Sequence, residues 1–299
     1  TEYRGGRGRG VFGSGATPSG TNVIDMIEIA TTGDAIDFGD DTLVRQEGNA
    51  SFASATRGCF CGGLITPSPG ANTSNIAYVT IPSQGGASDF GDLATAQQRN
   101  AGLSDSTRGI SAGGGDGPRT DAIEFVTIAT TGNGSDFGTL SKIRAGMGAC
   151  ASPTRGLFAG GNDSSNENII DFITIQTKGN AETFGNLTDD PNSLAGCSNS
   201  TRGLFAGGQN PSNVNTIEYV TIATLGNSAD FGDLANATDY LGACASATRG
   251  VFGGGQTPTK LDTIQYVTIA TTGNTVDFGN LTVARRFCMG LSDVHGGLG

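Results

Sequence analysis

One arginine recurs along the chain in a setting that could do chemistry. It stands before a glycine and an apolar residue, and the last copies are 47 residues apart. The copies are Arg9, Arg57, Arg108, Arg155, Arg202 and Arg249. The planar guanidinium fork binds anions, carboxylates and main-chain carbonyls. Six such forks at equivalent turns indicate either a ring that holds turns in place or a lining for an anionic ligand.

An aspartate recurs with the same period, just before a phenylalanine and a glycine. The copies are Asp37, Asp89, Asp136, Asp230 and Asp277, and Thr183 replaces the aspartate in the remaining repeat. The expected turns that carry the arginines and the aspartates lie on one face. We therefore predict a structural turn ring in which the two sets form ion pairs. Exposed pairs of this kind contribute about 0–1 kcal/mol each.

The nucleophiles and the one imidazole form no catalytic pattern. His295 is the only histidine, and no serine or cysteine near it belongs to a nucleophile motif. Cys150, Cys197 and Cys244 are equivalents in successive repeats, so their side chains should point the same way rather than meet. We expect all six cysteines to be free thiols that pack as small hydrophobic residues. The sequence predicts no enzyme.

Ligand-binding signatures are also missing from the sequence. No Gly-Gly pair is followed by lysine and serine or threonine, so none is a phosphate-binding loop. The Gly-Gly pairs are expected to provide positive φ or close packing near the axis. Acidic stretches such as Asn162-Asp163 and Asp189-Asp190 do not have calcium-loop spacing and are expected to be solvated turns. We predict no metal site and no cofactor.

The elements that position these residues follow from one repeat unit. From Arg144 the unit predicts strands at 148–152, 157–159, 169–176 and 182–184, separated by turns rich in glycine and asparagine. Four short strands repeated six times are typical of a β-propeller, and a β-solenoid is the alternative. The predicted fold is an all-β, six-bladed propeller of four-stranded blades.

The two ends of the chain predict how the ring closes. Residues 1–8 are an N-terminal extension, and 9–299 form a single propeller with repeats starting near the six arginines. The first repeat lacks its first strand, while residues 286–292 form an extra one after the last repeat. We predict that 286–292 complete blade one by pairing with 9–13, which removes an open sheet edge.

The composition excludes some partners. The net charge is -11, with 15% charged residues and 50 glycines. A strongly acidic chain repels phosphate backbones and anionic lipid surfaces, so nucleic-acid binding is not expected. No apolar run is long enough for membrane insertion.

The repeats differ mainly in the loops after the second and fourth strands, on the face opposite the arginine turns. Irregular loops on a rigid scaffold commonly form binding surfaces. The candidate binding-face residues are Thr66, Asn72, Asp116, Arg119, Asn162, Asp163, Asn210 and Lys260.

The unit resembles a kelch repeat, with Gly207-Gly208 after an apolar strand, Tyr219 in the third strand and Phe231 near the end. Phenylalanine replaces the late kelch tryptophan, so the resemblance implies kelch-like architecture and not a characterised kelch family.

The segments TRGLFAGG, IEYVTIATTGN and DFGDL are similar, over residues 9–299, to repeat proteins of marine phages and cyanophages. This resemblance implies a virion location and a non-enzymatic role in the tail, a fibre or the capsid surface. Other virion proteins, with a host-surface glycan or receptor, are then the expected partners. A carbohydrate-binding propeller is the alternative, and a propeller enzyme is the third and least supported reading.

Overall fold

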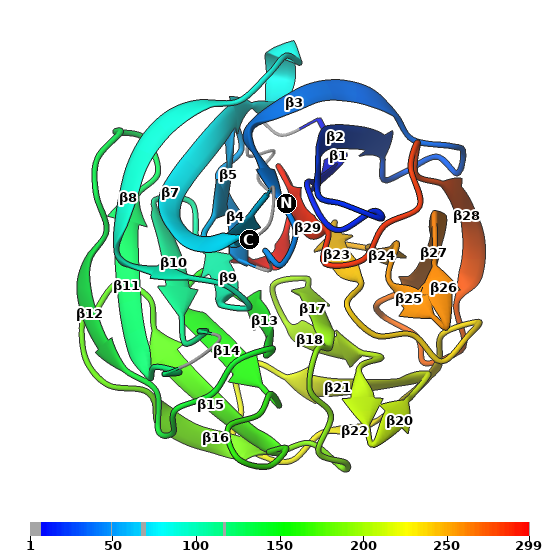
Figure 1. Ribbon diagram of the computed structural model, residues 1–299. Helices are drawn as coiled ribbons and strands as arrows, with labels where there is room; N and C mark the ends of the chain where they lie inside the picture. The colour runs from blue at the N-terminus through cyan, green and yellow to red at the C-terminus, as the bar shows by residue number, and fades with distance from the viewer. Residues whose placement is uncertain (1–6, 49, 67–69, 116–117, 299) are drawn as a thin grey trace.

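The computed structural model describes residues 7–48, 50–66, 70–115 and 118–298. The described chain is almost entirely β-structure, in sheets arranged like propeller blades around a central axis (Figure 1). Neighbouring strands in each sheet are antiparallel, and in four of the sheets the strand nearest the axis is the one that precedes the repeated arginine.

Four repeats each form a separate four-stranded sheet, and one of these is the repeat used for prediction. Its strands are β13 (Gly148–Ala151), β14 (Arg155–Ala159), β15 (Ile169–Thr174) and β16 (Glu182–Asn186). All four predicted strands are present, although β14 begins earlier, at the arginine. The next two sheets consist of β17 (Ala195–Ser198), β18 (Arg202–Ala206), β21 (Thr216–Thr221) and β22 (Ala229–Asp233), then β23 (Gly242–Ala245), β24 (Arg249–Gly253), β27 (Thr263–Thr268) and β28 (Val276–Asn280). The fourth consists of β9 (Ala101–Ser104), β10 (Arg108–Ala112), β11 (Ala122–Thr127) and β12 (Ser135–Thr139).

Nine further strands form one sheet. One end contains β29 (Met289–Ser292), β1 (Arg9–Gly13), β2 (Thr21–Glu28) and β3 (Ile36–Arg45). The other contains β4 (Ala50–Ala53), β5 (Arg57–Cys61), β7 (Ala71–Thr80) and β8 (Ser88–Gln97). The two-residue strand β6 (Leu64–Ile65) joins the two groups.

The prediction of six separate blades therefore needs correction: four sheets are separate, and the strands of the first two repeats share the fifth. The joining contact is a single register pair, Arg45 with Ile65. It forms because the long loop of the second repeat folds back on β7, where Leu64 pairs with Asn72, and because β3 continues to Arg45.

The predicted closure is present. Strand β29 pairs antiparallel with β1, from Gly10 opposite Ser292 to Gly13 opposite Met289. The closing strand is shorter than the predicted 286–292 because Arg286 and Phe287 belong to the preceding loop. Of the predicted extension 1–8, residues 1–6 lie outside the described residues.

The smaller elements lie at the two faces. The hairpins β19 (Gln209–Asn210) with β20 (Ser212–Asn213), and β25 (Gln256–Thr257) with β26 (Thr259–Lys260), belong to the variable loops. Single-turn 3-10 helices occur at η1 (Ile81–Ser83) and η2 (Gly296–Leu298).

The core lies between neighbouring sheets rather than at the axis. Six clusters of buried apolar residues each combine side chains from adjacent repeats. This packing explains why a glycine follows each of the repeated arginines. A Cβ added at Gly203 would lie 2.6 Å from Cys150 Sγ of the preceding sheet. Glycine leaves the space that a neighbouring side chain fills.

Candidate functional site

The repeated arginines form a closed ring, but their partners are main-chain carbonyls. Each guanidinium donates through Nη1 to an isoleucine carbonyl oxygen in the next repeat, at 2.7–3.0 Å. The acceptors, in arginine order, are Ile81, Ile128, Ile175, Ile222, Ile269 and Ile29. The last bond, from Arg249 to Ile29, closes the circle. We call the side of the molecule with these turns the arginine face.

Five of these guanidiniums also lie over an aromatic ring of their own sheet. Arg202, for example, lies 4.4 Å from the centroid of Tyr219. The first repeat has Met26 at that position, and Arg9 instead forms an ion pair with Glu28 at 3.3 Å. Each guanidinium bonds the next repeat, and five of them also pack on their own sheet, so the ring holds neighbouring sheets together.

The prediction that the repeated aspartates form ion pairs with these arginines is wrong. None of the six ion pairs between described residues contains Asp37, Asp89, Asp136, Asp230 or Asp277. All five are exposed at the start of the outermost strand. The arginine sits at the inner side of the turn, where the next repeat's carbonyl is nearer than any of these carboxylates.

Three buried ion pairs were not predicted. Arg45 with Asp41, Arg144 with Asp171, and Arg285 with Asp25 have fully buried side chains and distances of 2.7–2.9 Å. Arg144 also donates to the carbonyls of Gly160 and Ile169. Burial lowers the pKa of Arg144, and Asp171 opposes that shift. These arginines occur in only some repeats, so the period that revealed the first set did not reveal them.

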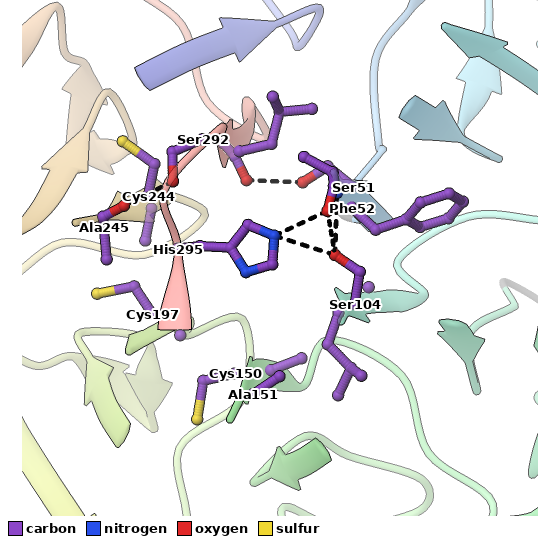
Figure 2. A pocket seen from close by; sticks show the side chains of 18 of the residues that line it. Ser51, Phe52, Ser104, Cys150, Ala151, Cys197, Cys244, Ala245, Ser292 and His295 are labelled. Atoms are coloured by element: carbon purple, nitrogen blue, oxygen red, sulfur yellow. Dashed lines mark hydrogen bonds between the residues drawn. The ribbon is translucent and has the colours of Figure 1, made fainter. Parts of the chain in front are cut away.

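A small cavity of about 60 Å³ lies at the axis, lined by the innermost strands and His295 (Figure 2). Alanine and serine alternate around one level of it: Ala53, Ser104, Ala151, Ser198, Ala245 and Ser292. Each serine hydroxyl donates to the carbonyl of the preceding alanine, at 2.6–2.8 Å. The axis therefore has an approximate threefold repeat of paired strands, and these hydroxyls are already engaged.

His295 lies half-buried beside this cavity, in the segment that follows β29. Its Nε2 lies 2.8 Å from the carbonyl oxygen of Ala53 and 3.2 Å from Ser104 Oγ, while Nδ1 accepts from the Gly297 N–H at 3.1 Å. We assign the proton to Nε2 because Nδ1 is an acceptor. Burial lowers the pKa of His295, which favours the neutral ring.

The contact between Ser104 and His295 does not have the arrangement of a nucleophile and its base. Ser104 Oγ already donates to the Ala53 carbonyl, and the Nδ1 of His295 faces a main-chain N–H rather than a carboxylate. In a catalytic triad that nitrogen donates to an acid. The geometry instead anchors segment 293–298 at the axis.

The carboxylate of Asp293 anchors the same segment to the N-terminal strand region. It accepts from the main-chain N–H groups of Arg7, Gly8 and Arg9 at 2.7–3.0 Å. The two ends of the described chain are thus joined by side-chain contacts as well as by strand pairing.

All six cysteines are free and buried, as predicted. Burial raises the pKa of Cys61 and of Cys197 to about 12 and raises the pKa of each remaining thiol. A buried thiol with such a pKa is an inert packing group.

The predicted loop residues lie on the face opposite the arginine turns, which we call the loop face, and most are held by neighbouring loops. Arg119 bonds the carbonyl of Asp163, Asn210 bonds Asp190, and Lys260 bonds the carbonyl of Thr17. Asn162 forms a bridge with Ala145, Thr66 donates to the Val44 carbonyl, and Asn72 pairs with Leu64. Asp116 lies outside the described residues. The structure brings these residues into pairs around the rim rather than into one cluster.

Sequence reasoning missed a ring at the axis on the loop face. Five residues, each just before an innermost strand, donate their main-chain N–H to the carbonyl of the equivalent residue in the preceding repeat, and a sixth, Glu47, accepts the first of these bonds. The members, which we call the axial ring, are Glu47, Arg99, Gly146, Ser193, Tyr240 and Phe287. Arg99, Ser193, Tyr240 and Phe287 adopt φ of 55–59°. All six residue types differ, but the residues directly before and after them also vary between repeats, so the sequence did not single out this ring.

Arg99 and Tyr240 cover the axis on this face. Arg99 Nη2 donates to Ser193 Oγ at 3.0 Å, reaching past Gly146, which has no side chain to block it. The Tyr240 ring stacks on buried Phe287, with centroids 3.9 Å apart.

Within the described residues, no group of three or more histidine, cysteine, aspartate or glutamate side chains could hold a metal ion. No helix in the described part of the chain is long and apolar enough to cross a membrane. No protein-family model matches the chain, and no curated protein matches it.

Proposed function

We propose that this protein is a non-enzymatic structural or adhesion module whose loop face makes the functional contact. The observation that carries the proposal is the division between the two faces. On the arginine face every repeated arginine bonds the next repeat, whereas on the loop face the axial ring has a different residue in each repeat. A rigid scaffold with one irregular face is suited to binding.

We also propose that the ring is a six-bladed propeller in which the nine-stranded sheet counts as two blades. Its halves meet through one register pair, and the six arginine bonds link six successive repeats. The description of the blades as kelch-like rests on the amino-acid sequence of the repeats alone.

The proposed setting is a phage virion, in a tail, a fibre or the capsid surface, with other virion proteins as partners. The virion setting rests on the resemblance of the repeat sequence to repeat proteins of marine phages and cyanophages. A chain low in charge and rich in glycine, serine, threonine and asparagine suits an exposed particle component.

The test is mass spectrometry and antibody labelling of particles purified from a lysate by density gradient. We expect the chain to sediment with the particles in a fixed ratio to the other structural proteins and to withstand a salt wash. A chain that is found only in the soluble fraction would overturn the virion assignment. A chain that is stable and folded but not attached to particles would leave the structural role of the repeated arginines unaffected.

A further inference from the structure

One of the buried arginines has a proline as its equivalent in the next repeat. Arg144 lies in the loop before β13, and Pro191 lies at the same place before β17, 47 residues later. The Arg144 guanidinium donates to the carbonyl oxygens of Gly160 and Ile169 and to the Asp171 carboxylate, at 2.7–2.8 Å. The equivalents of these three acceptors, again 47 residues later, are Gly207, Thr216 and Glu218. The sheet that contains β17 therefore keeps the acceptors of a guanidinium and lacks the guanidinium.

A cavity of about 10 Å³ marks the place of the missing guanidinium. All three retained acceptors line it, together with Pro191 and Asp189. A volume of about 10–15 Å³ by this measure is the least that holds one particle the size of a water molecule. The retained acceptors thus border a space for a single small ligand.

The Glu218 carboxylate at this cavity has no counter-ion. The residue is only 4% exposed and takes part in none of the ion pairs between described residues. Its Oε2 accepts from the Thr188 N–H and from the Ser228 hydroxyl, while Oε1 has no hydrogen bond among the described residues. A buried carboxylate is stable only when a cation or several donors compensate for its lost hydration.

Two other repeats that lack the arginine differ from this one. Before β23 the arginine is replaced by Thr238, and the acid is replaced by Gln265, so that no charge needs compensation. Before β9 the acid is kept as Glu124, and the amide side chain of Gln97 replaces the arginine. The sheet of β17 instead combines a buried carboxylate with a proline, which offers no donor.

We propose that Glu218, Asp189 and the carbonyl oxygens of Gly207 and Thr216 bind a calcium ion. Carboxylates together with main-chain carbonyls are the hard oxygen ligands that Ca²⁺ takes, and the two negative charges match a divalent ion. Calcium–oxygen distances of about 2.3–2.6 Å are shorter than hydrogen bonds, so the space of one water molecule is sufficient. Asp189 is exposed, so water reaches that side of the ion and completes its coordination.

The ion takes the role that Arg144 has one repeat earlier. It joins the loop before β17 to the loop-face ends of β18 and β21. The spacing of Asp189 and Asp190 matches no calcium loop because the remaining ligands come from a different hairpin of the same sheet. The proposal does not depend on the proposed function.

The test is isothermal titration of the intact, chelator-treated protein with calcium chloride. We expect one site with a dissociation constant of about 0.1–1 mM, the range of calcium sites in extracellular modules. At a calcium concentration about ten- to a hundredfold higher, the melting temperature should rise by about 2–4 °C. Magnesium chloride and potassium chloride at the same concentration should bind at least about tenfold more weakly. Equal binding of either ion would overturn the calcium assignment.

Two variants locate the site. Glu218→Gln copies the amide that β27 carries at the equivalent position, Gln265, so the variant should fold. It should weaken calcium binding by about tenfold or more and abolish the shift in melting temperature. Pro191→Arg supplies the missing guanidinium and should raise the melting temperature without calcium while abolishing calcium binding.

The matched control is Asp230→Asn, which removes an exposed carboxylate at the outer strand of the same sheet. Its calcium affinity should stay within about twofold of the parent. Equal losses for Asp230→Asn and Glu218→Gln would show that the ion is attracted by the general negative charge of the surface, and would overturn the site. The absence of calcium binding at about 10 mM would show that the cavity holds only water, and would overturn it as well.

Discussion

The repeated arginine acts through two surfaces of its guanidinium. In Arg202 the fork bonds the Ile269 carbonyl at 2.8 Å, and the flat side covers Tyr219. Replacing Arg202 with methionine keeps most of the stem packing and removes both interactions. We expect the free energy of unfolding to fall by about 1–3 kcal/mol, measured by urea denaturation.

Lys142→Met is the control for that change, because the ion pair of Lys142 with Glu167 has a half-exposed amine. It should cost less than about 1 kcal/mol. Equal losses for the two variants would contradict a ring of inter-sheet bonds with a structural role.

The Arg-Gly glycine gives a second residue-scale prediction. Gly203→Ala places a methyl group against Cys150 Sγ, at 2.6 Å before any adjustment. We expect a loss of about 1–3 kcal/mol from overpacking, measured by thermal or urea unfolding.

The double variant Cys150→Ala with Gly203→Ala should recover much of that loss, because the added methyl group enters the space that the sulfur vacates. Strictly additive effects of the two substitutions would show that the glycine is needed for a reason other than the neighbouring sulfur.

At the scale of elements, segment 293–298 is held at the axis by His295, and the imidazole ring of His295 can take up a proton. His295 has a pKa lowered by burial, so between that value and about 6.5 the unfolded chain binds a proton that the folded chain does not. Stability is therefore highest above about pH 6.5 and falls with decreasing pH in that window, by up to about 1.4 kcal/mol per pH unit. Asp105 and Asp293 reduce the effect because they favour the charged ring.

The measurement is the melting temperature at several pH values for the parent and for His295→Gln. Glu124 and Asp239 have raised pKa values and contribute with the opposite sign, so the difference between parent and variant is the informative quantity. We expect the parent to lose stability faster than the variant on acidification. Parallel curves would mean that His295 has the same pKa in the folded and the unfolded protein.

At the scale of the whole molecule, ring closure depends on β29. Met289 and Leu291 lie in a core cluster with Val11 and complete the sheet that β1 begins. Removing residues 289–299 should leave an open β1 edge and exposed apolar side chains, which favours aggregation. Size-exclusion chromatography should show oligomers in place of a monomer.

A synthetic peptide of residues 286–298 supplied during refolding should restore the monomeric form. A scrambled peptide of the same composition is the control and should have no effect. A truncated chain that stays monomeric and keeps the parental melting temperature would contradict a structural requirement for closure.

Much of the architecture was predictable because it depends on local, repeated signals. The period placed the four strands of each unit, and the missing first strand of repeat one predicted the pairing of β29 with β1. The free state of Cys150, Cys197 and Cys244 followed from their equivalence in successive repeats.

The partners of individual side chains depended on tertiary packing. Whether Arg57 meets an aspartate or the Ile128 carbonyl is set by the angle between neighbouring sheets, which no local pattern encodes. The same holds for His295, which lies against Ala53 although 242 residues separate them in the chain. The axial ring, with Arg99 reaching Ser193, exists only because six distant loops meet at one axis. The sequence by itself determined the repeated strand pattern and the strand that closes the ring, because those signals recur within each unit. Only the tertiary structure decided which polar groups meet between units, because those contacts are made after the sheets have packed.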